Sequence, residues 1–345
     1  MMTLFEKNEA YKKRLHTRNI LIVTVCALFL VVSFFVSMST GYSKLSPIDT
    51  LYTILGYGTE KQELVLFQFR LPRIVISILV GMGLSLSGCI IQGVSRNPLA
   101  DPGLLGINAG SGLLVILCVI FFGRDTFLSI FTLPLFSLIG ASAAAVIVYV
   151  LAYKKREGLA PIRLILTGIA VQAGISAFTM VLVVGLDEKQ YNSVASWQAG
   201  QFLGANWKFA GALFPWLCLL IPYVMLKARS LDVLSLGDEV AFSLGASVEK
   251  ERRILLAVSV ALAACCVAVG GNIGFVGLVA PHLARRLVGP RHRILLPVCA
   301  LVGAVVVTVA DTIGRTVIQP SSIPTGVMTA IIGAPYFIYL LVRSK

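Results

Sequence analysis

The chain has 345 residues, of which 57% are hydrophobic and only 13% are charged. Soluble domains carry about 25% charged residues, so this composition excludes an ordinary soluble protein. The net charge of +13 would suit a nucleic-acid-binding protein, but most basic residues lie in short segments between apolar runs. Membrane topology accounts for them better. The sequence therefore predicts an integral membrane protein that binds no nucleic acid.

Long uncharged stretches predict the membrane spans. Each is close to or above the roughly 20 residues that a helix needs to cross a bilayer. Continuously apolar runs exclude a β-barrel, whose strands alternate apolar and polar residues, and only helices then satisfy their own backbone hydrogen bonds in lipid. We predict an all-α membrane protein with ten transmembrane helices, over residues 20–40, 72–94, 103–122, 131–153, 161–185, 208–227, 254–272, 275–288, 294–311 and 325–343.

The first apolar run, residues 20–38, follows a basic segment that contains Arg14 and Arg18. It is longer than the apolar part of a signal peptide, which has about 7–15 residues, so we expect a retained first span. Residues 1–19 then form a cytoplasmic N-terminal arm, and residues 20–345 form one membrane domain. The positive-inside rule favours cytoplasmic N- and C-termini, because basic residues concentrate on the side of the arm.

Little in the sequence points to catalysis or metal binding. The seven cysteines lie singly or as the pair Cys265 and Cys266, mostly within apolar runs, as expected of small packing residues. Of the three histidines we expect only His282 to be buried, as a structural group rather than a metal ligand. No phosphate-binding loop of the form G-x-x-x-x-G-K-S/T occurs. We therefore predict no catalytic residue, no metal site and no bound cofactor, with ATP hydrolysed by another polypeptide.

Small residues recur at the spacing of helix contacts, as at Gly81 and Ser85, and predict closely packed spans. The eighth span is short, and its Pro281 and His282 follow a glycine-rich segment that begins at Gly270. We expect a kinked or broken helix there, with its freed backbone groups facing protein or a cavity.

The longest cytoplasmic segment, residues 227–253, contains an amphipathic stretch. Val240, Leu244 and Val248 lie at positions i, i+4 and i+8, so a short helix would present one apolar face and one acidic face. Such a helix could dock into a groove on a soluble partner or lie on the bilayer surface. Periodicity alone does not separate these two interpretations.

Charged residues at the outer ends of the spans also allow two interpretations. Arg70 and Arg73 flank the start of the second span, and Arg315 follows Asp311 after the ninth. These arginines could snorkel to the interface or form a cationic rim that binds an acidic partner. Asp311 and Asp101 are the carboxylates nearest the membrane interior, which raises a proton-coupling hypothesis. Both lie at predicted span ends, and two acids do not make a relay.

Four strings carry a family resemblance: RLPR at 70–73, RNPLADPGLLG at 96–106, GFVGLVAPH at 274–282, and PTGV leading to GAP at 324–335. Together they resemble the permease subunits of type II ABC importers for iron-siderophores, haem and cobalamin, over nearly the whole chain beyond the first span. The structural or path residues that the resemblance implies are Asn97, Pro98, Asp101, Pro102, Gly277, Pro281, His282, Pro324, Gly326 and Pro335.

The resemblance implies a ten-helix permease and a transporter with two such subunits, identical or related, around a central path. Two cytoplasmic ATPases and an extracytoplasmic substrate-binding protein complete the complex in the cytoplasmic membrane of a bacterium. The implied cargo is a ferric siderophore, with cobalamin or haem as the alternative. An ion-driven secondary transporter would instead need an acidic or sodium-coordinating group in mid-span, which the sequence lacks.

Site residues follow from the resemblance position by position. Arg70, Arg73 and Arg315 match the outward-facing arginines that grip acidic residues on the binding protein. The loop 227–253 matches the segment that seats in the ATPase, through Gly237, Asp238, Glu239, Ala241, Leu244 and Gly245. One departure is Gln201, where the family commonly has a serine, in a segment that leads towards the external mouth.

Overall fold

The computed structural model describes residues 4–41, 45–122, 129–155, 158–202, 204–318 and 321–343. The first three residues of the predicted arm and residues 344–345 lie outside this part. The described chain is helical except for loops and one antiparallel hairpin, β1 (Tyr153–Lys154) with β2 (Gly158–Leu159). The prediction of an all-α membrane fold is confirmed.

Ten helices correspond to the ten predicted spans. Seven of the described helices are long and apolar enough to cross a bilayer, whereas α5, α13 and the apolar part of α15 are shorter. The helices are α1 (Leu4–Ser39), α4 (Leu71–Ser95), α5 (Ile107–Phe122), α6 (Ser129–Ala152), α7 (Pro161–Val184), α9 (Trp207–Leu226), α12 (Val248–Gly270), α13 (Val276–Val288), α14 (His292–Val317) and α15 (Thr325–Arg343).

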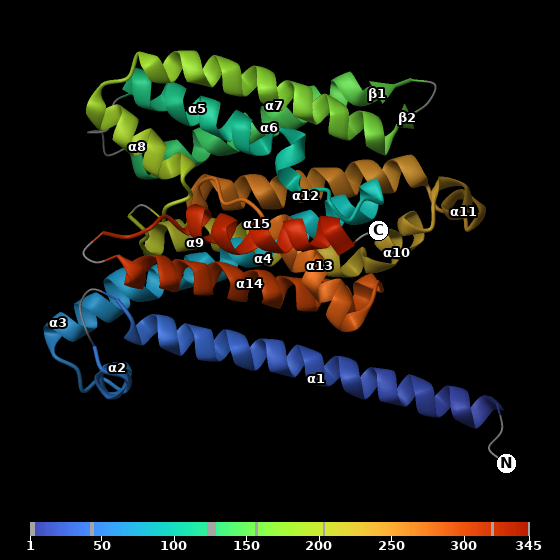
Figure 1. Ribbon diagram of the computed structural model, residues 1–345, viewed down its shortest axis with the longest axis horizontal. Helices are drawn as coiled ribbons and strands as arrows, with labels where there is room; N and C mark the ends of the chain where they lie inside the picture. Colours follow the sequence, from blue (N-terminus) through green and yellow to red (C-terminus); the bar gives the residue numbers. More distant parts are fainter. Residues whose placement is uncertain are drawn as a thin grey trace.

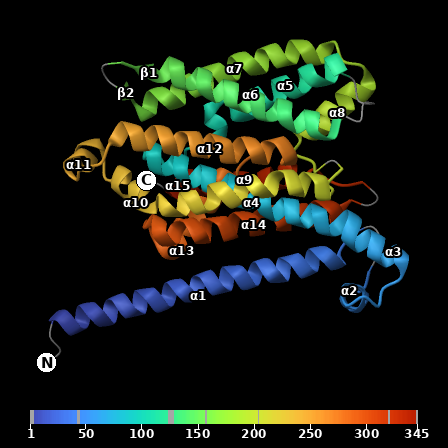
Figure 2. The same cartoon turned by 180° about the vertical axis from the view of Figure 1, so that it is seen from behind.

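Short helices gather at the two ends of the bundle, as Figures 1 and 2 show. One end carries α2 (Pro47–Ile54), α3 (Glu60–Glu63) and α8 (Glu188–Gln198). The other carries α10 (Ala228–Ser235), α11 (Asp238–Ser243), the hairpin and the start of α1. We call these the outer end and the coupling end, after the roles that the sequence analysis predicts for them. Two irregular turns complete the helical elements, the π-helical η1 (Leu64–Arg70) before α4 and the 3-10 helix η2 (Pro102–Leu105) before α5.

Helix α4 lies at the centre of the bundle, in contact with α9, α12, α13 and α14. Most of its residues are buried. On one side α5, α6 and α7 pack together and meet the centre mainly through α12, and on the other side α1 runs along α14 (Figure 1). The chain is therefore layered, with two apolar faces, on α1 and α7, at its lateral edges.

Glycines let the backbones around α4 touch. A methyl group added at Gly88 would collide with the carbonyl group of Gly277 on α13, and one at Gly81 would collide with Gly303 on α14. Small residues allow this approach in membranes, where packing rather than the hydrophobic effect holds helices together. The close packing predicted around Gly81 is present in the structure.

We expect Gly88→Ala to destabilise the folded permease by about 3 kcal/mol, because α13 must move away from α4 to admit the methyl group. Thermal unfolding of the detergent-purified protein measures the effect. Gly174→Ala on α7 is the matched control, since nothing lies within 4 Å of its added methyl group, and alanine is the better helix former. Equal melting temperatures for the two variants would contradict the α4–α13 contact.

The break expected near Pro281 lies earlier in the chain. Residues 271–275 are irregular, with Phe275 in the left-handed region, and α13 then continues through Pro281. Because proline has no N–H, the carbonyl oxygen of Gly277 lacks its helical donor. The Gln92 side-chain amide on α4 lies within donor distance of this oxygen, at 3.5 Å, and of the Leu278 carbonyl oxygen, at 3.4 Å.

Candidate functional site

A charged cluster lies at the outer end, between α4, α14 and α15. The Asp311 carboxylate accepts two hydrogen bonds from Arg73, at 2.8 and 3.0 Å between the closest atom pairs, and one from Arg315 at 3.0 Å. Thr325 donates a further bond at 2.8 Å, and Arg315 also bonds to Ser37 on α1. Asp311 is 1% exposed, so these four donors replace the water that a buried carboxylate would lose.

The three arginines that the resemblance expects to face outward are largely buried within this single chain. Arg73 and Arg315 are only 18% and 11% exposed. Arg70 is 5% exposed, and its guanidinium donates to the backbone carbonyl of Met38 and lies against Gly41. Asp311 accounts for the burial of Arg73 and Arg315, because a carboxylate in this interior position draws its counter-charges inward, whereas Arg70 is held by the Met38 carbonyl.

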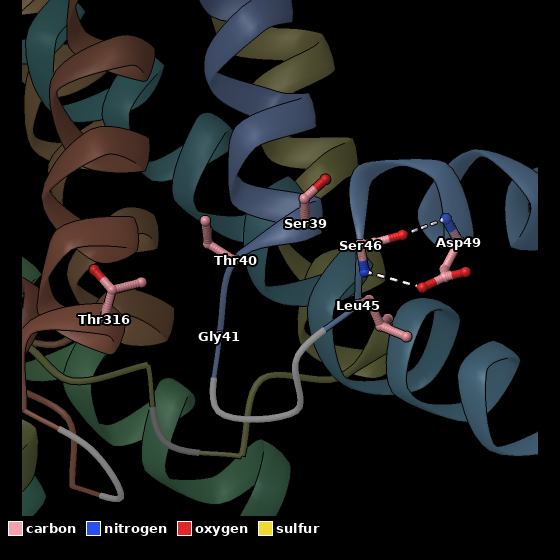
Figure 3. Close-up of a pocket in the computed structure, with 7 residues that line it drawn as sticks. All are labelled: Ser39, Thr40, Gly41, Leu45, Ser46, Asp49 and Thr316. Carbon is pink, nitrogen blue, oxygen red and sulfur yellow. Dashed lines mark hydrogen bonds between the residues drawn. The ribbon is translucent and has the colours of Figure 1, made fainter.

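A cavity of about 550 Å³ opens beside this cluster, between the end of α1, the start of α2 and the end of α14 (Figure 3). Thr40 on the α1 side and Thr316 on α14 face it from opposite walls. Asp49 and Ser46 also line it, but they are bonded to each other in the capping box that begins α2. The outer end therefore offers a recess next to a set of guanidiniums.

The string RNPLADP builds the connection from α4 to α5. Arg96 ends α4 in the left-handed conformation, the Asn97 side chain accepts from Leu99, and Asp101 accepts from Gly103 at 2.8 Å and caps η2. Among the described residues the Asp101 carboxylate bonds to the Gly103 N–H rather than to another acid, which gives no support to a proton relay.

This connection packs directly on α13. Pro98 belongs to its turn, and a methyl group added at Gly277 would lie 2.8 Å from Pro102 and 3.0 Å from Asp101. The structure thus brings together motif residues that are about 175 positions apart and predicted only as members of separate strings. Their shared role is close packing of the loop against the broken helix.

A second junction joins three turns near the outer end. The N–H of Gly326, which follows Pro324 at the start of α15, donates to the Gly200 carbonyl at 3.1 Å, and the turn at Asn272 lies against both glycines. Gln201, the departure from the family pattern, donates to the Ser322 hydroxyl at 3.3 Å. The longer side chain therefore ties the segment before α9 to the segment before α15.

The histidine prediction is wrong in one respect. His292, at the start of α14, is 3% exposed. Both its backbone N–H and its ring Nδ1 bond to the Asp232 carboxylate of α10, at 2.8 and 2.7 Å. His282 is only half-buried, with its ring against that of Tyr336, the residue that follows Pro335 in α15. His292 was missed because its partner lies 60 positions away.

At the coupling end, Asp238 forms ion pairs that connect the loop to the helix bundle. It pairs with Arg252 on α12 at 2.6 Å and with Arg96 at the end of α4 at 3.4 Å. Arg252 is buried and also donates to the Leu159 carbonyl of the hairpin. Asp238 therefore fixes α11 to two core helices and, through Arg252, to β2.

Lys227, at the end of α9, connects the start of the loop 227–253 to α12. It donates to both carboxylate oxygens of Glu251 on α12, at 2.8 and 2.9 Å. This hydrogen bond raises the pKa of Lys227 above its ordinary value, so the pair stays ionised at neutral pH. Both ends of the loop 227–253 are thus anchored to the bundle by ion pairs.

Between these anchors the chain exposes an apolar tip. Val240, Phe242 and Leu244, which we call the coupling tip, are all exposed, Phe242 by 77%. The continuous amphipathic helix expected from residue 240 to residue 248 does not form, because α11 ends at Ser243 and Gly245 turns the chain with φ +80°.

The other predicted coupling residues hold this tip in place. Ala241 is fully buried, Gly237 begins α11 with φ +108°, and Glu239 is exposed beside the tip. The sequence analysis named Leu244 but not Phe242. A large aromatic residue inside a polar loop could have pointed to Phe242. The tip lies at the coupling end (Figure 2), where α11 projects from the bundle.

Known proteins resemble this chain in both sequence and fold. The sequence matches the FecCD transport family over residues 29–343. It is 48% identical over 330 residues to the iron(3+)-hydroxamate import system permease protein FhuG of Bacillus subtilis, covering 94% of this chain and 98% of the relative. It is 42% identical over 324 residues to the iron-uptake system permease protein FeuC of the same organism, with 92% and 96% covered.

A solved structure, described as an inward-facing conformation of a metal-chelate type ABC transporter, resembles this fold with a TM-score of 0.82 and 32% identity. The likeness covers 93% of this chain and 99% of the solved one. Sequence and fold agree over nearly the whole length of the chain. The chain belongs to the FecCD transport family, and it is a multi-pass membrane permease subunit.

Proposed function

We propose that this chain is one of two permease subunits in an ATP-driven importer that carries iron(III)-siderophore complexes across the cytoplasmic membrane. The observation that carries the proposal is the coupling tip, because exposed apolar side chains on a loop anchored by ion pairs mark a protein contact. The partner is a separate ATPase, since the sequence has no phosphate-binding loop of its own.

The coupling end faces the cytoplasm in this proposal. The start of α1, the hairpin, α10 and α11 share that end (Figure 1), and so does the last turn of α13. Basic residues concentrate there, among them Lys154, Lys250 and Arg286. The positive-inside rule assigns such an end to the cytoplasm, and the N- and C-terminal helices then both reach it.

A substrate-binding protein docks at the outer end. Arg73 and Arg315 share the Asp311 carboxylate there, so these three side chains together keep a net positive charge. Arg73 and Arg315 reach the surface in part, and Arg70 lies buried near Arg315. Acidic residues on the binding protein complement this charge, which raises the association rate and fixes the docked orientation.

Transport follows from alternating access of the two permease subunits around a central path. Closure of the ATPases presses on the coupling tip, and the ion pairs of Asp238 and Lys227 transmit that movement to α4, α9 and α12. The chain contributes the path, the docking surfaces and the coupling, and the partner hydrolyses ATP.

For the cargo we propose ferric hydroxamates first, because the relative at 48% identity is named for iron(3+)-hydroxamate import. Iron-starved cells with and without this gene should be given radiolabelled ferric hydroxamate, catecholate and citrate complexes one at a time, with labelled haem and cobalamin as controls. We expect deletion to remove uptake of the hydroxamate complex. Loss confined to labelled haem or cobalamin would overturn the iron-siderophore cargo while keeping the permease role, and unchanged uptake of every complex would contradict the proposal.

A further inference from the structure

A polar cavity of about 520 Å³ lies among α5, α7, the end of α8 and the turn after α12. Its polar side chains are Asn108 on α5, Gln172, Ser176 and Thr179 on α7, Gln198 on α8 and Asn272 on the turn. No Asp, Glu, Lys, Arg or His belongs to its lining within the described residues. A cavity of this size takes a small molecule, and this one offers only uncharged hydrogen-bonding groups.

Several of these polar side chains form no hydrogen bond with the described part of the chain. Gln172, Ser176 and Thr179 follow one another at positions i, i+4 and i+7, so they lie on one face of α7. In the described part of the chain they and Asn108 make no side-chain hydrogen bond, and the buried Thr179 hydroxyl is left unsatisfied. An unsatisfied buried hydroxyl such as that of Thr179 costs roughly 1–3 kcal/mol, so packing alone would favour an apolar residue at this position.

The position of α7 at the edge of the bundle indicates what its uncharged polar side chains would contact. Only 6% of its membrane-spanning window is buried, against 78% for the span that contains α4. Figure 1 shows α7 at a lateral edge of the bundle, on the side opposite α1. In the importer proposed above, a helix at the edge that carries polar groups belongs to the path between the two permease subunits rather than to lipid.

We propose that this cavity is a cargo subsite that selects electrically neutral ferric chelates, a proposal that rests on the proposed import function. Three hydroxamate groups carry one negative charge each and neutralise Fe³⁺, whereas catecholate and citrate complexes keep net negative charge. An uncharged cavity in a low-dielectric membrane penalises a charged cargo. The amides of Asn108 and Gln172 and the hydroxyls of Ser176 and Thr179 can donate to the oxygen atoms on the surface of a neutral chelate.

Thr179→Val and Gln172→Leu test the subsite in the complete transporter, reconstituted in proteoliposomes with its ATPase and binding protein. We expect each to lower uptake of a radiolabelled neutral ferric trihydroxamate about tenfold, because a hydrogen-bond donor is lost. ATP hydrolysis stimulated by the loaded binding protein should stay at the wild-type rate. The matched control is Thr24→Val on α1, whose exposed hydroxyl bonds only to the Ile20 carbonyl and lies outside the cavity.

The charge selectivity is tested with a derivative of the same chelate that bears one carboxylate away from the iron and still loads the binding protein. We expect the wild-type transporter to import it more slowly than the neutral parent, and Gln172→Lys to reverse this order. Import of both compounds at the same rate by the wild-type transporter would overturn the selectivity for neutral cargo.

Two further outcomes separate the subsite from its alternatives. Wild-type uptake by Thr179→Val and Gln172→Leu would overturn the subsite and leave the import function standing. A smaller yield of assembled transporter in these variants, with normal uptake per complex, would assign the side chains to the contact between permease subunits and also overturn it. If the wild-type transporter imports no ferric chelate, the import function itself fails.

Discussion

Asp311→Asn is expected to destabilise the permease by roughly 3–5 kcal/mol, the cost of breaking a buried ion pair by removing one partner. The amide keeps the shape of the carboxylate but leaves Arg73 and Arg315 facing each other without a counter-charge, at a site where residue 311 is 1% exposed. Thermal unfolding of the purified protein in detergent measures the loss, and a lower melting temperature is the expected result.

Two variants separate charge from hydrogen bonding in this cluster. Thr325→Val removes one bond to Asp311 and should cost only about 1 kcal/mol. Combining Arg315→Met with Asp311→Asn removes one of the two facing guanidiniums, so the double variant should be more stable than the sum of the single effects predicts. Simple additivity, or an unchanged melting temperature for Asp311→Asn, would show that the cluster is not an electrostatic unit.

The second large effect is expected at the coupling tip. Phe242→Asp should abolish association with the ATPase, because a charge replaces the largest exposed apolar side chain of the tip, and central aromatic residues at interfaces contribute about 2–4 kcal/mol. Co-purification of the ATPase with the tagged permease measures this directly. The stability of the permease alone should change by less than about 0.5 kcal/mol, since the side chain is exposed.

Tyr57→Asp is the matched control for this experiment. Tyr57 is 79% exposed, as much as Phe242, but it lies between α2 and α3 at the outer end. Its substitution should leave ATPase co-purification at the wild-type level. Full ATPase recovery with Phe242→Asp, or equal losses in the two variants, would exclude the tip as the ATPase contact.

The spans were predictable from sequence because lipid demands long apolar helices. Their boundaries were less predictable, because charged residues near the span ends were expected to lie outside the helices. The ninth span was expected to end at residue 311, whereas α14 continues to Val317. Asp311 and Arg315 are one helical turn apart and form an ion pair that Arg73 joins, so the helix tolerates them. Similarly, α12 begins at Val248 rather than residue 254, because its polar first turns lie outside the apolar run and are held by Lys227 and Asp238.

The site was predictable only where its chemistry is local. The turn residues Asn97 and Asp101 act on neighbours two positions away, so their string already contained their structural role. The pairing of His292 with Asp232 joins positions far apart in the chain, and no sequence pattern reports it. The cavity polar groups were missed for the same reason, because Asn108 and Gln172 meet only after α5 and α7 have packed.

Helix α14 joins the two ends of the molecule. Its first residue is held to α10 by Asp232, and its last turns carry Asp311 and Arg315. A helix of 26 residues is about 39 Å long, so a tilt of about 5° moves one end by roughly 3 Å relative to the other. In the importer proposed above, such a tilt of α14 would let ATPase closure weaken the contact with a docked binding protein. The helix would move as a rigid body, so no side chains would have to rearrange between the two membrane faces.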